Sequence, residues 1–214
     1  MGPVIKYTLR VFWQKKGNAK YTSHLDTQRT VTRALVRSGL PLYYSQGYNP
    51  HLKLVFALPV SMYQEALYDV FDIDLTEKVD ANEAARRIAA VMPADMPVLK
   101  AAYPKRKFKE LAFASYEIAL ETALTAKGVE ARLSGEVVVE KKSKKKCAMV
   151  DVSPMIKSVS AEDKEGGVLL KMTLTASPED YLNPKYIVEY LGDDVSFSHT
   201  VRTMLMDSSG APLE

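Results

Sequence analysis

The order of strand-like and helix-like segments limits what this chain can fold into more than any other feature. Residues 4–14 alternate apolar and polar side chains with a period near two, which is typical of a strand. Ser23 and Asp26 then form a helix-capping pattern, and Gly39 ends the helix that follows. The next predicted segments are strands over 54–60 and 66–75, a helix over 81–92 and a strand over 98–102. This order, βαββαβ, is that of a ferredoxin-like unit.

The first helix is predicted to extend to about Ser38 and to bury one side of its surface. The apolar side chains expected on that side are Leu25, Val31, Leu35 and Val36. Because Gly39 and Pro41 follow, the helix cannot continue further.

A similar order of segments recurs in the second half of the chain. The predicted elements are a strand over 113–122, a short helix or turn over 124–133, a hairpin or bent strand formed by 136–142 and 148–152, a strand over 168–176, a helix over 184–191 and a strand over 195–206. We therefore predict an α+β protein with two tandem ferredoxin-like units, residues 1–103 and 111–214. The charged, proline-bearing segment 103–110 is predicted to link them.

Composition places this chain among ordinary globular proteins. Hydrophobic residues make up 47% of its 214 residues and charged residues 26%. No apolar run approaches the length of a membrane span, and the start MGPVIKYTLR lacks the apolar region of a secretion signal. A single cysteine, Cys147, excludes an internal disulfide framework and a cysteine-rich zinc site. We expect a cytoplasmic protein that does not contact membranes and that holds no cofactor.

Basic residues gather in two short runs, although the formal net charge is only +3. The runs consist of Lys105, Arg106, Lys107 and Lys109, and of Lys141, Lys142, Lys144, Lys145 and Lys146. Such runs can neutralise phosphates, but charge runs are more often a solvated linker and a hairpin tip.

Three arginines of the first predicted helix are spaced by four residues, so Arg29, Arg33 and Arg37 lie along one slowly drifting face. Asp26 lies three residues before Arg29, close enough to orient it. A row of guanidinium groups suits RNA phosphates, because each is permanently charged and binds oxygens bidentately. The alternative is a solvated helix face with one ion pair.

Aromatic and basic residues alternate in the segment after this helix. Tyr48, Asn49 and Lys53 are candidate RNA-binding residues, since aromatic rings beside basic groups are typical of single-strand recognition. Tyr43 and Tyr44 can equally well pack on the sheet. Tyr48 is the better candidate, because it lies in a predicted loop between Gly47 and Pro50.

His24 and His51 are the candidate catalytic residues if the protein is an enzyme. A neutral His24 at the first helical turn could act as a general base, with Asp26 setting its tautomer. The spacing of these residues matches no metal site, so no metal is predicted. The helix from 24 to 38 is roughly 22 Å long. The two histidines can therefore share a site only if the 40–51 loop folds back along the helix, and we expect it to do so.

Several stretches of residues 20–60 resemble a bacterial family of unknown function, described as radical SAM-linked or radical SAM-associated. The residues that carry the resemblance are Ser23-His24-Leu25-Asp26, Arg29, Arg33-Ala34, Gly39-Leu40-Pro41, Tyr44-Ser45-Gln46-Gly47-Tyr48-Asn49-Pro50-His51, Lys53 and Leu58-Pro59-Val60. The resemblance implies a separate partner, a B12-binding radical SAM protein. It also implies an RNA-centred setting. We expect no DNA partner.

The leading hypothesis from the sequence is an accessory RNA-binding protein that presents an RNA or ribonucleoprotein substrate to a radical SAM enzyme. Whether the chain is itself an enzyme stays open. One alternative is a metal-independent endoribonuclease that uses His24 or His51. Another is an adaptor that binds only protein, with its tyrosines as interface anchors.

Overall fold

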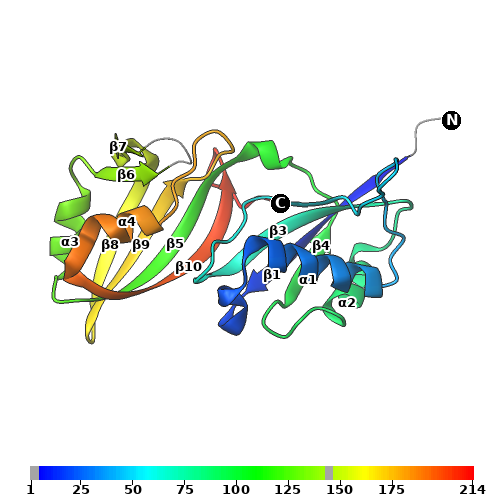
Figure 1. Ribbon diagram of the computed structural model, residues 1–214, viewed down its shortest axis with the longest axis horizontal. Coiled ribbons are helices and arrows are strands. Elements are labelled where there is room, and N and C mark those ends of the chain that lie inside the picture. Colours follow the sequence, from blue (N-terminus) through cyan, green and yellow to red (C-terminus); the bar gives the residue numbers. More distant parts are fainter. Residues whose placement is uncertain (1–4, 143–146) are drawn as a thin grey trace. The chain divides into compact units, whose positions relative to one another are not determined.

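A computed structural model describes residues 5–142 and 147–214 of this mixed α+β protein (Figure 1). The chain divides into two compact units. The first comprises the described residues through Phe108 together with Glu214, and the second comprises Lys109–Leu213. No helix within 5–142 and 147–214 has both the length and the apolar character required to cross a membrane.

The first unit is an antiparallel sheet with the strand order β4-β1-β3-β2. Both helices contribute to one core on a single face of this sheet, since Leu35 and Ile88 pack in the same buried cluster as Trp13. The elements are β1 (Tyr7–Lys15), the 3-10 helix η1 (Gly17–Tyr21), α1 (His24–Arg37), β2 (Leu54–Phe56), β3 (Gln64–Leu75), α2 (Ala81–Ala89) and β4 (Val98–Ala102).

Local capping determines where α1 begins, as predicted. The Ser23 hydroxyl accepts the Asp26 backbone N–H at 3.1 Å, which satisfies one of the unpaired donors of the first turn. Val31 and Leu35 are buried as expected. The prediction that Leu25 and Val36 are also buried is wrong, because both are exposed. At roughly 100° per residue, each lies more than 90° around the helix from Val31.

The C-terminal end of α1 is held by two arginines. Gly39 has a positive φ of 65°, which allows the chain to turn immediately after the helix. Arg87 of α2 donates to the carbonyl of Ser38 at 3.0 Å and to the carbonyl of Gly39. In return, Arg37 of α1 donates to the carbonyl of Val91 at 3.0 Å. These bonds join the two helices at the point where the chain turns toward β2.

A buried ion pair lies within the sheet of the first unit. The side chain of Arg10 is fully buried and contacts both carboxylate oxygens of Asp72, at 2.8 and 2.9 Å. The ring of Phe108 covers this guanidinium, with 4.3 Å between the Arg10 Cζ and the ring centroid. Burial raises the pKa of Asp72, and the hydrogen bonds from Arg10 oppose that rise.

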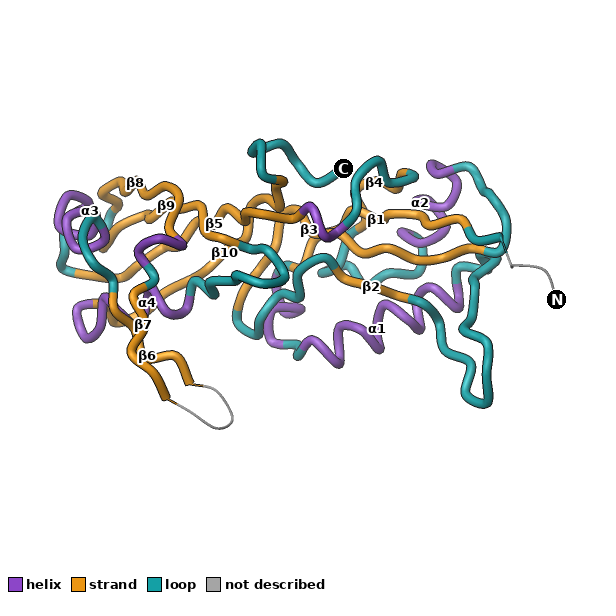
Figure 2. Tube along the Cα trace, turned by 90° about the horizontal axis from the view of Figure 1, so that it is seen from above, coloured by secondary structure: helices purple, strands orange, loops and turns teal. Residues whose placement is uncertain are grey.

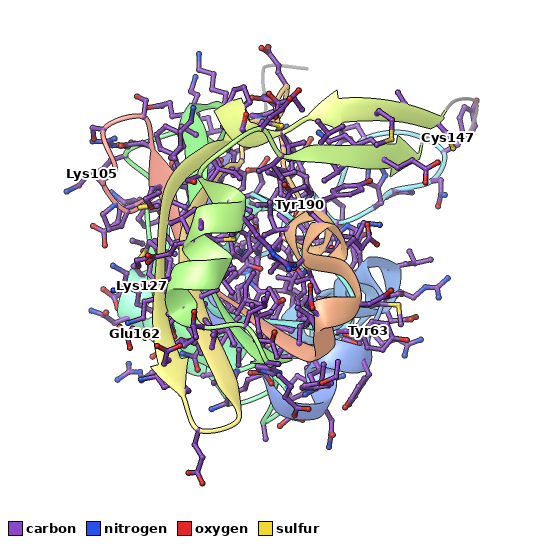
Figure 3. The ribbon with its side chains drawn as sticks, turned by 90° about the vertical axis from the view of Figure 1, so that its left-hand side faces the viewer. Tyr63, Lys105, Lys127, Cys147, Glu162 and Tyr190 are labelled. Carbon is purple, nitrogen blue, oxygen red and sulfur yellow. The ribbon has the colours of Figure 1, made fainter. Side chains whose placement is uncertain are left out.

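The second unit repeats the arrangement with one addition. Its antiparallel sheet has the order β10-β5-β9-β8, and β6 and β7 form a separate two-stranded sheet. In Figure 3 helices α3 and α4 lie side by side in front of the strands, and Cys147 marks the outer end of the β6–β7 hairpin. The elements are β5 (Leu111–Thr122), α3 (Ala126–Leu133), β6 (Val138–Lys142), β7 (Cys147–Asp151), β8 (Ile156–Lys164), β9 (Gly167–Thr175), α4 (Lys185–Leu191) and β10 (Val195–Asp207).

The predicted hairpin around the lysine run is confirmed, but sequence analysis missed β8. Among the described residues this strand pairs only with β9, and its side chains at Ser158, Ser160 and Glu162 are exposed. The apolar residues that alternate with them are only Val159 and Ala161, a run too short and too weakly apolar to indicate a strand by itself. Lys144, Lys145 and Lys146 of the lysine run lie outside the described residues, as does the side chain of Lys142.

Replacing Gly39 by alanine is expected to lower the free energy of unfolding by about 1–3 kcal/mol. The residue would have to keep a φ of 65°, and its Cβ would lie 2.8 Å from Nη2 of Arg87. Urea-induced unfolding measures the effect. Gly135→Ala is the matched control, because no atom lies within 4 Å of the added Cβ and the backbone there is not left-handed. Equal unfolding midpoints for the two variants would contradict the role assigned to the Gly39 turn.

Candidate functional site

His24 lies at the first position of α1 and is exposed. Its ring meets the ring of Phe56 edge-on, with 5.4 Å between the centroids and 84° between the planes. This contact places the imidazole beside the last residue of β2. Asp26, in the same helical turn, accepts a hydrogen bond from the Ser23 hydroxyl at 2.7 Å and lies 3.5 Å from Arg29.

The three arginines of α1 have different surroundings. Arg29 pairs with Asp26 at 3.5 Å, and both side chains are largely exposed. Arg33 is exposed and has neither an ion-pair nor a hydrogen-bond partner within residues 5–142 and 147–214. Arg37 donates to the carbonyl of Val91, so part of its hydrogen-bonding capacity serves the packing of α1 against α2. Arg29 and Arg33 are therefore the guanidinium groups best placed for an external anion.

The segment that contains Tyr48 forms a hairpin of its own. Tyr44 pairs with Leu52, and the Ser45 backbone N–H donates to the carbonyl of His51 at 2.9 Å. The Ser45 hydroxyl lies 2.8 Å from Nδ1 of His51 and also accepts the His51 backbone N–H at 3.0 Å. These bonds join the two arms of the hairpin at its base. At its tip Asn49 is exposed and Tyr48 is fully exposed.

An ion pair joins this hairpin to the sheet. Lys53 lies 3.2 Å from the buried carboxylate of Asp74, which also accepts the hydroxyl of Thr8 at 2.8 Å. The Tyr43 backbone N–H donates to the carbonyl of Asp74 at 2.9 Å, and the Tyr43 ring is buried. Lys53 is thus engaged within the protein, although about half of its side chain remains accessible.

The two histidines do not share a site. His24 contacts Phe56, whereas His51 precedes that residue by five extended positions, or roughly 16 Å along the chain. The prediction that the 40–51 loop folds back over the first helix is wrong. Figure 2 shows the connection between α1 and β2 projecting beyond the C-terminal end of the helix. The loop pairs with itself and with the end of β3, so its backbone groups need no contact with α1.

The structure also shows an exposed pair of aromatic residues, Tyr21 and Tyr63, which the sequence did not indicate as candidates. The two residues are 55% and 66% exposed, and their rings meet edge-on with 6.1 Å between the centroids. Tyr63 has a positive φ of 66°. Among the described residues it is the only one other than glycine whose φ is positive. That conformation costs a residue with a Cβ roughly 1–2 kcal/mol. Nothing in the sequence around Tyr63 indicates a left-handed backbone, because the usual residues for it are glycine and asparagine.

The surroundings of the candidate residues limit the kind of site that they form. Within the described ranges no group of three His, Cys, Asp or Glu side chains could hold a metal ion. The Ser45–His51 contact closes a loop, and the same oxygen already accepts a backbone N–H. A groove of about 470 Å³ lies between β6 and α4, but none of the predicted site residues lines it. The candidate site is therefore an exposed surface with aromatic, guanidinium and imidazole groups.

Removing the Ser45 hydroxyl by the change Ser45→Ala is expected to loosen the tip of the hairpin by about 1 kcal/mol, because two hydrogen bonds to His51 are lost. Hydrogen exchange at the His51 amide should become several-fold faster. Gln46→Ala, at an exposed position of the same tip, is the control. Exchange at the same rate in Ser45→Ala and in the wild-type protein would show that the hydroxyl does not hold the loop.

Comparison with known proteins gives one family. No curated protein matches this chain. The model of a family described as "Uncharacterized protein conserved in bacteria (DUF2344)" matches residues 8–184, which cover the first unit and most of the second. The resemblance of residues 20–60 to an uncharacterised bacterial family is thus confirmed at that level, and the link to radical SAM enzymes stays a prediction. The chain belongs to the DUF2344 family.

Proposed function

We propose that this protein binds single-stranded RNA through the exposed surface of its first unit. The observation that supports this most is the position of Tyr48. Its ring is fully exposed at the tip of a hairpin whose base is closed by the Ser45–His51 hydrogen bonds. Because the Tyr48 ring is not buried on folding, it adds little to the stability of the protein. The hydrogen-bonded loop fixes its position, so its face is free to stack on a base.

Charged groups on α1 complement this ring. Arg29 and Arg33 are exposed on the helix that precedes the hairpin, and their planar guanidinium groups can bind phosphate oxygens in pairs. Asn49, at the tip of the hairpin, is available for hydrogen bonds to a base edge. Lys53 would share its charge between Asp74 and a phosphate.

We further infer that both units, the described residues through Phe108 with Glu214 and Lys109–Leu213, are ferredoxin-like domains. The strand orders β4-β1-β3-β2 and β10-β5-β9-β8, all antiparallel, support this inference. In the second domain, the β6–β7 hairpin would be an insertion between α3 and β8. Folds of this class occur in many RNA-binding proteins, so the analogy favours RNA without identifying a site.

The proposed partner is a separate, B12-binding radical SAM enzyme, to which this protein would present an RNA or ribonucleoprotein substrate. This part of the proposal rests on the resemblance of the Ser23–Asp26 and Ser45–His51 segments alone. The partner would carry the cofactors and the radical chemistry. The chain itself would contribute binding and orientation of the substrate.

The endoribonuclease alternative receives less support from the geometry. A concerted acid–base mechanism needs two groups within reach of one phosphate, and His24 and His51 lie at different ends of β2. Either histidine alone would have to act with an arginine. The adaptor alternative remains a competitor, since exposed tyrosines also anchor protein interfaces.

Replacing Arg29 and Arg33 together by glutamine is expected to weaken RNA binding and to flatten its salt dependence by about one logarithmic unit per lost phosphate contact. The free energy of unfolding should change by about 1 kcal/mol or less, because both side chains are exposed. Fluorescence anisotropy of a labelled uridine-rich RNA across a salt series measures the effect.

Arg86→Gln is the matched control for this experiment, because Arg86 is an exposed arginine on α2 that pairs with Glu83. Its salt slope should equal that of the wild-type protein. A double variant that binds RNA with the wild-type slope would remove the arginines of α1 from the site. Wild-type protein that binds no RNA even at low salt would favour the adaptor.

Purified wild-type protein is expected to leave both structured and single-stranded RNA intact, with or without a chelator. The reason is that the two imidazoles do not converge on one phosphate. Gel analysis of end-labelled RNA after prolonged incubation measures this. Cleavage that is lost in His24→Ala or His51→Ala, with RNA binding retained, would establish the endoribonuclease instead.

A further inference from the structure

A second exposed aromatic group lies at the opposite end of α1 from the Tyr48 hairpin. Tyr21 ends η1, three residues before the first residue of α1, and Tyr63 directly precedes β3. The two residues are 55% and 66% exposed, and their rings stand at 75° to each other with centroids 6.1 Å apart. The ammonium group of Lys20 lies 5.3 Å from the centroid of the Tyr21 ring. We propose that Tyr21, Tyr63 and Lys20 form a further subsite that stacks a base of single-stranded RNA.

The backbone holds the Tyr63 ring in place. The N–H of Tyr63 donates to the carbonyl of Lys20 at 2.7 Å, which joins the loop before β3 to η1. With a φ of 66°, Tyr63 adopts a conformation that residues with a Cβ rarely populate. This conformation is kept although the residue is 66% exposed. Backbone strain without burial of the side chain is typical of residues that serve binding.

A cation lies beside the two rings, since the Lys20 ammonium group is next to the Tyr21 ring. The two carboxylates next to η1, those of Glu65 and Asp95, accept the backbone N–H groups of Gly17 and Asn18 at 2.8 and 3.0 Å. Among the described residues, Lys20 pairs with no carboxylate. A ring face with an ammonium group beside it matches a base and its phosphate.

The subsite rests on the proposed function and extends it along α1. Tyr21 and Tyr63 lie at the N-terminal end of this helix, the Tyr48 hairpin follows its C-terminal end, and Arg29 and Arg33 lie between. The 14 residues of α1 span about 21 Å. At about 3.4 Å per stacked nucleotide, a strand that reaches both aromatic groups has roughly six nucleotides or more. A strand shorter than this would engage only one of them.

The decisive variant is Tyr63→Gly. Glycine accepts a φ of 66° without strain, so the loop can keep its shape while the ring is removed. We expect about a tenfold loss of affinity for a labelled uridine RNA of about ten nucleotides. The melting temperature should stay the same or rise. Tyr21→Ala should weaken binding similarly and serves as the second variant if Tyr63→Gly is poorly folded.

Two controls separate stacking from other causes. Phe197→Ala removes a ring that is 55% exposed in the second unit, and it should bind like the wild-type protein. An abasic strand of the same length should bind more weakly than the uridine RNA, because it offers phosphates without bases. On the abasic strand, Tyr63→Gly and the wild-type protein should have the same affinity.

The outcomes distinguish this subsite from the proposed function. Salt-dependent RNA binding that is unchanged in both Tyr63→Gly and Tyr21→Ala would overturn the subsite and leave RNA binding by the first unit intact. The exposed rings would then be assigned to a protein partner. No RNA binding by the wild-type protein at any salt concentration would overturn both. Loss of binding in Tyr63→Gly that is equally large on the abasic strand would also overturn the stacking role.

Discussion

Antiparallel pairing of β2 with β3 determines where the functional side chains of the first unit lie. In this register Leu54 is opposite Ile73 and Phe56 is opposite Phe71. The strand therefore runs from the hairpin at one end toward the start of α1 at the other. His24 packs against Phe56, and His51 remains with the hairpin. The three paired residues of β2 separate these two ends. The residues around His24 and the residues around His51 therefore form two groups rather than one.

This separation suits a ligand that is long and flexible. A small substrate needs a concave pocket in which several groups converge. The candidate residues instead follow the exposed side of α1 and the hairpin beyond it, with an aromatic group at each end. A single nucleic-acid strand can contact such a surface at several points, each of them weak, and gain affinity from their sum.

Several charged side chains of the first unit already have partners within the protein. Arg87 and Arg37 satisfy carbonyl groups at the ends of the helices, and Lys53 pairs with Asp74. Arg10 is buried with Asp72. Counting basic residues therefore overstates the charge that is available to a ligand, because a cation already paired within the fold gains less from a phosphate. Arg29 and Arg33 remain on the exposed side of α1.

The sequence by itself determined the features that depend on near neighbours. Ser23 and Gly39 mark the two ends of α1, and the strand and helix order of the first unit follows from periodicity and from caps. The paired strands around the lysine run were predicted for the same reason. A cap or a turn is decided within about four residues, so its signal is local.

Only the tertiary structure decided which residues meet. Arg37 and Lys53 find their partners in segments far from them in the sequence. The separation of His24 from His51 follows from the pairing of β2 with β3. Tyr63, with its left-handed backbone, donates to the distant carbonyl of Lys20. The edge strand β8 was missed because only two weakly apolar residues, Val159 and Ala161, alternate with its exposed polar side chains. Long-range pairing in the sheet sets these contacts, and no window of neighbouring residues contains the information that specifies them.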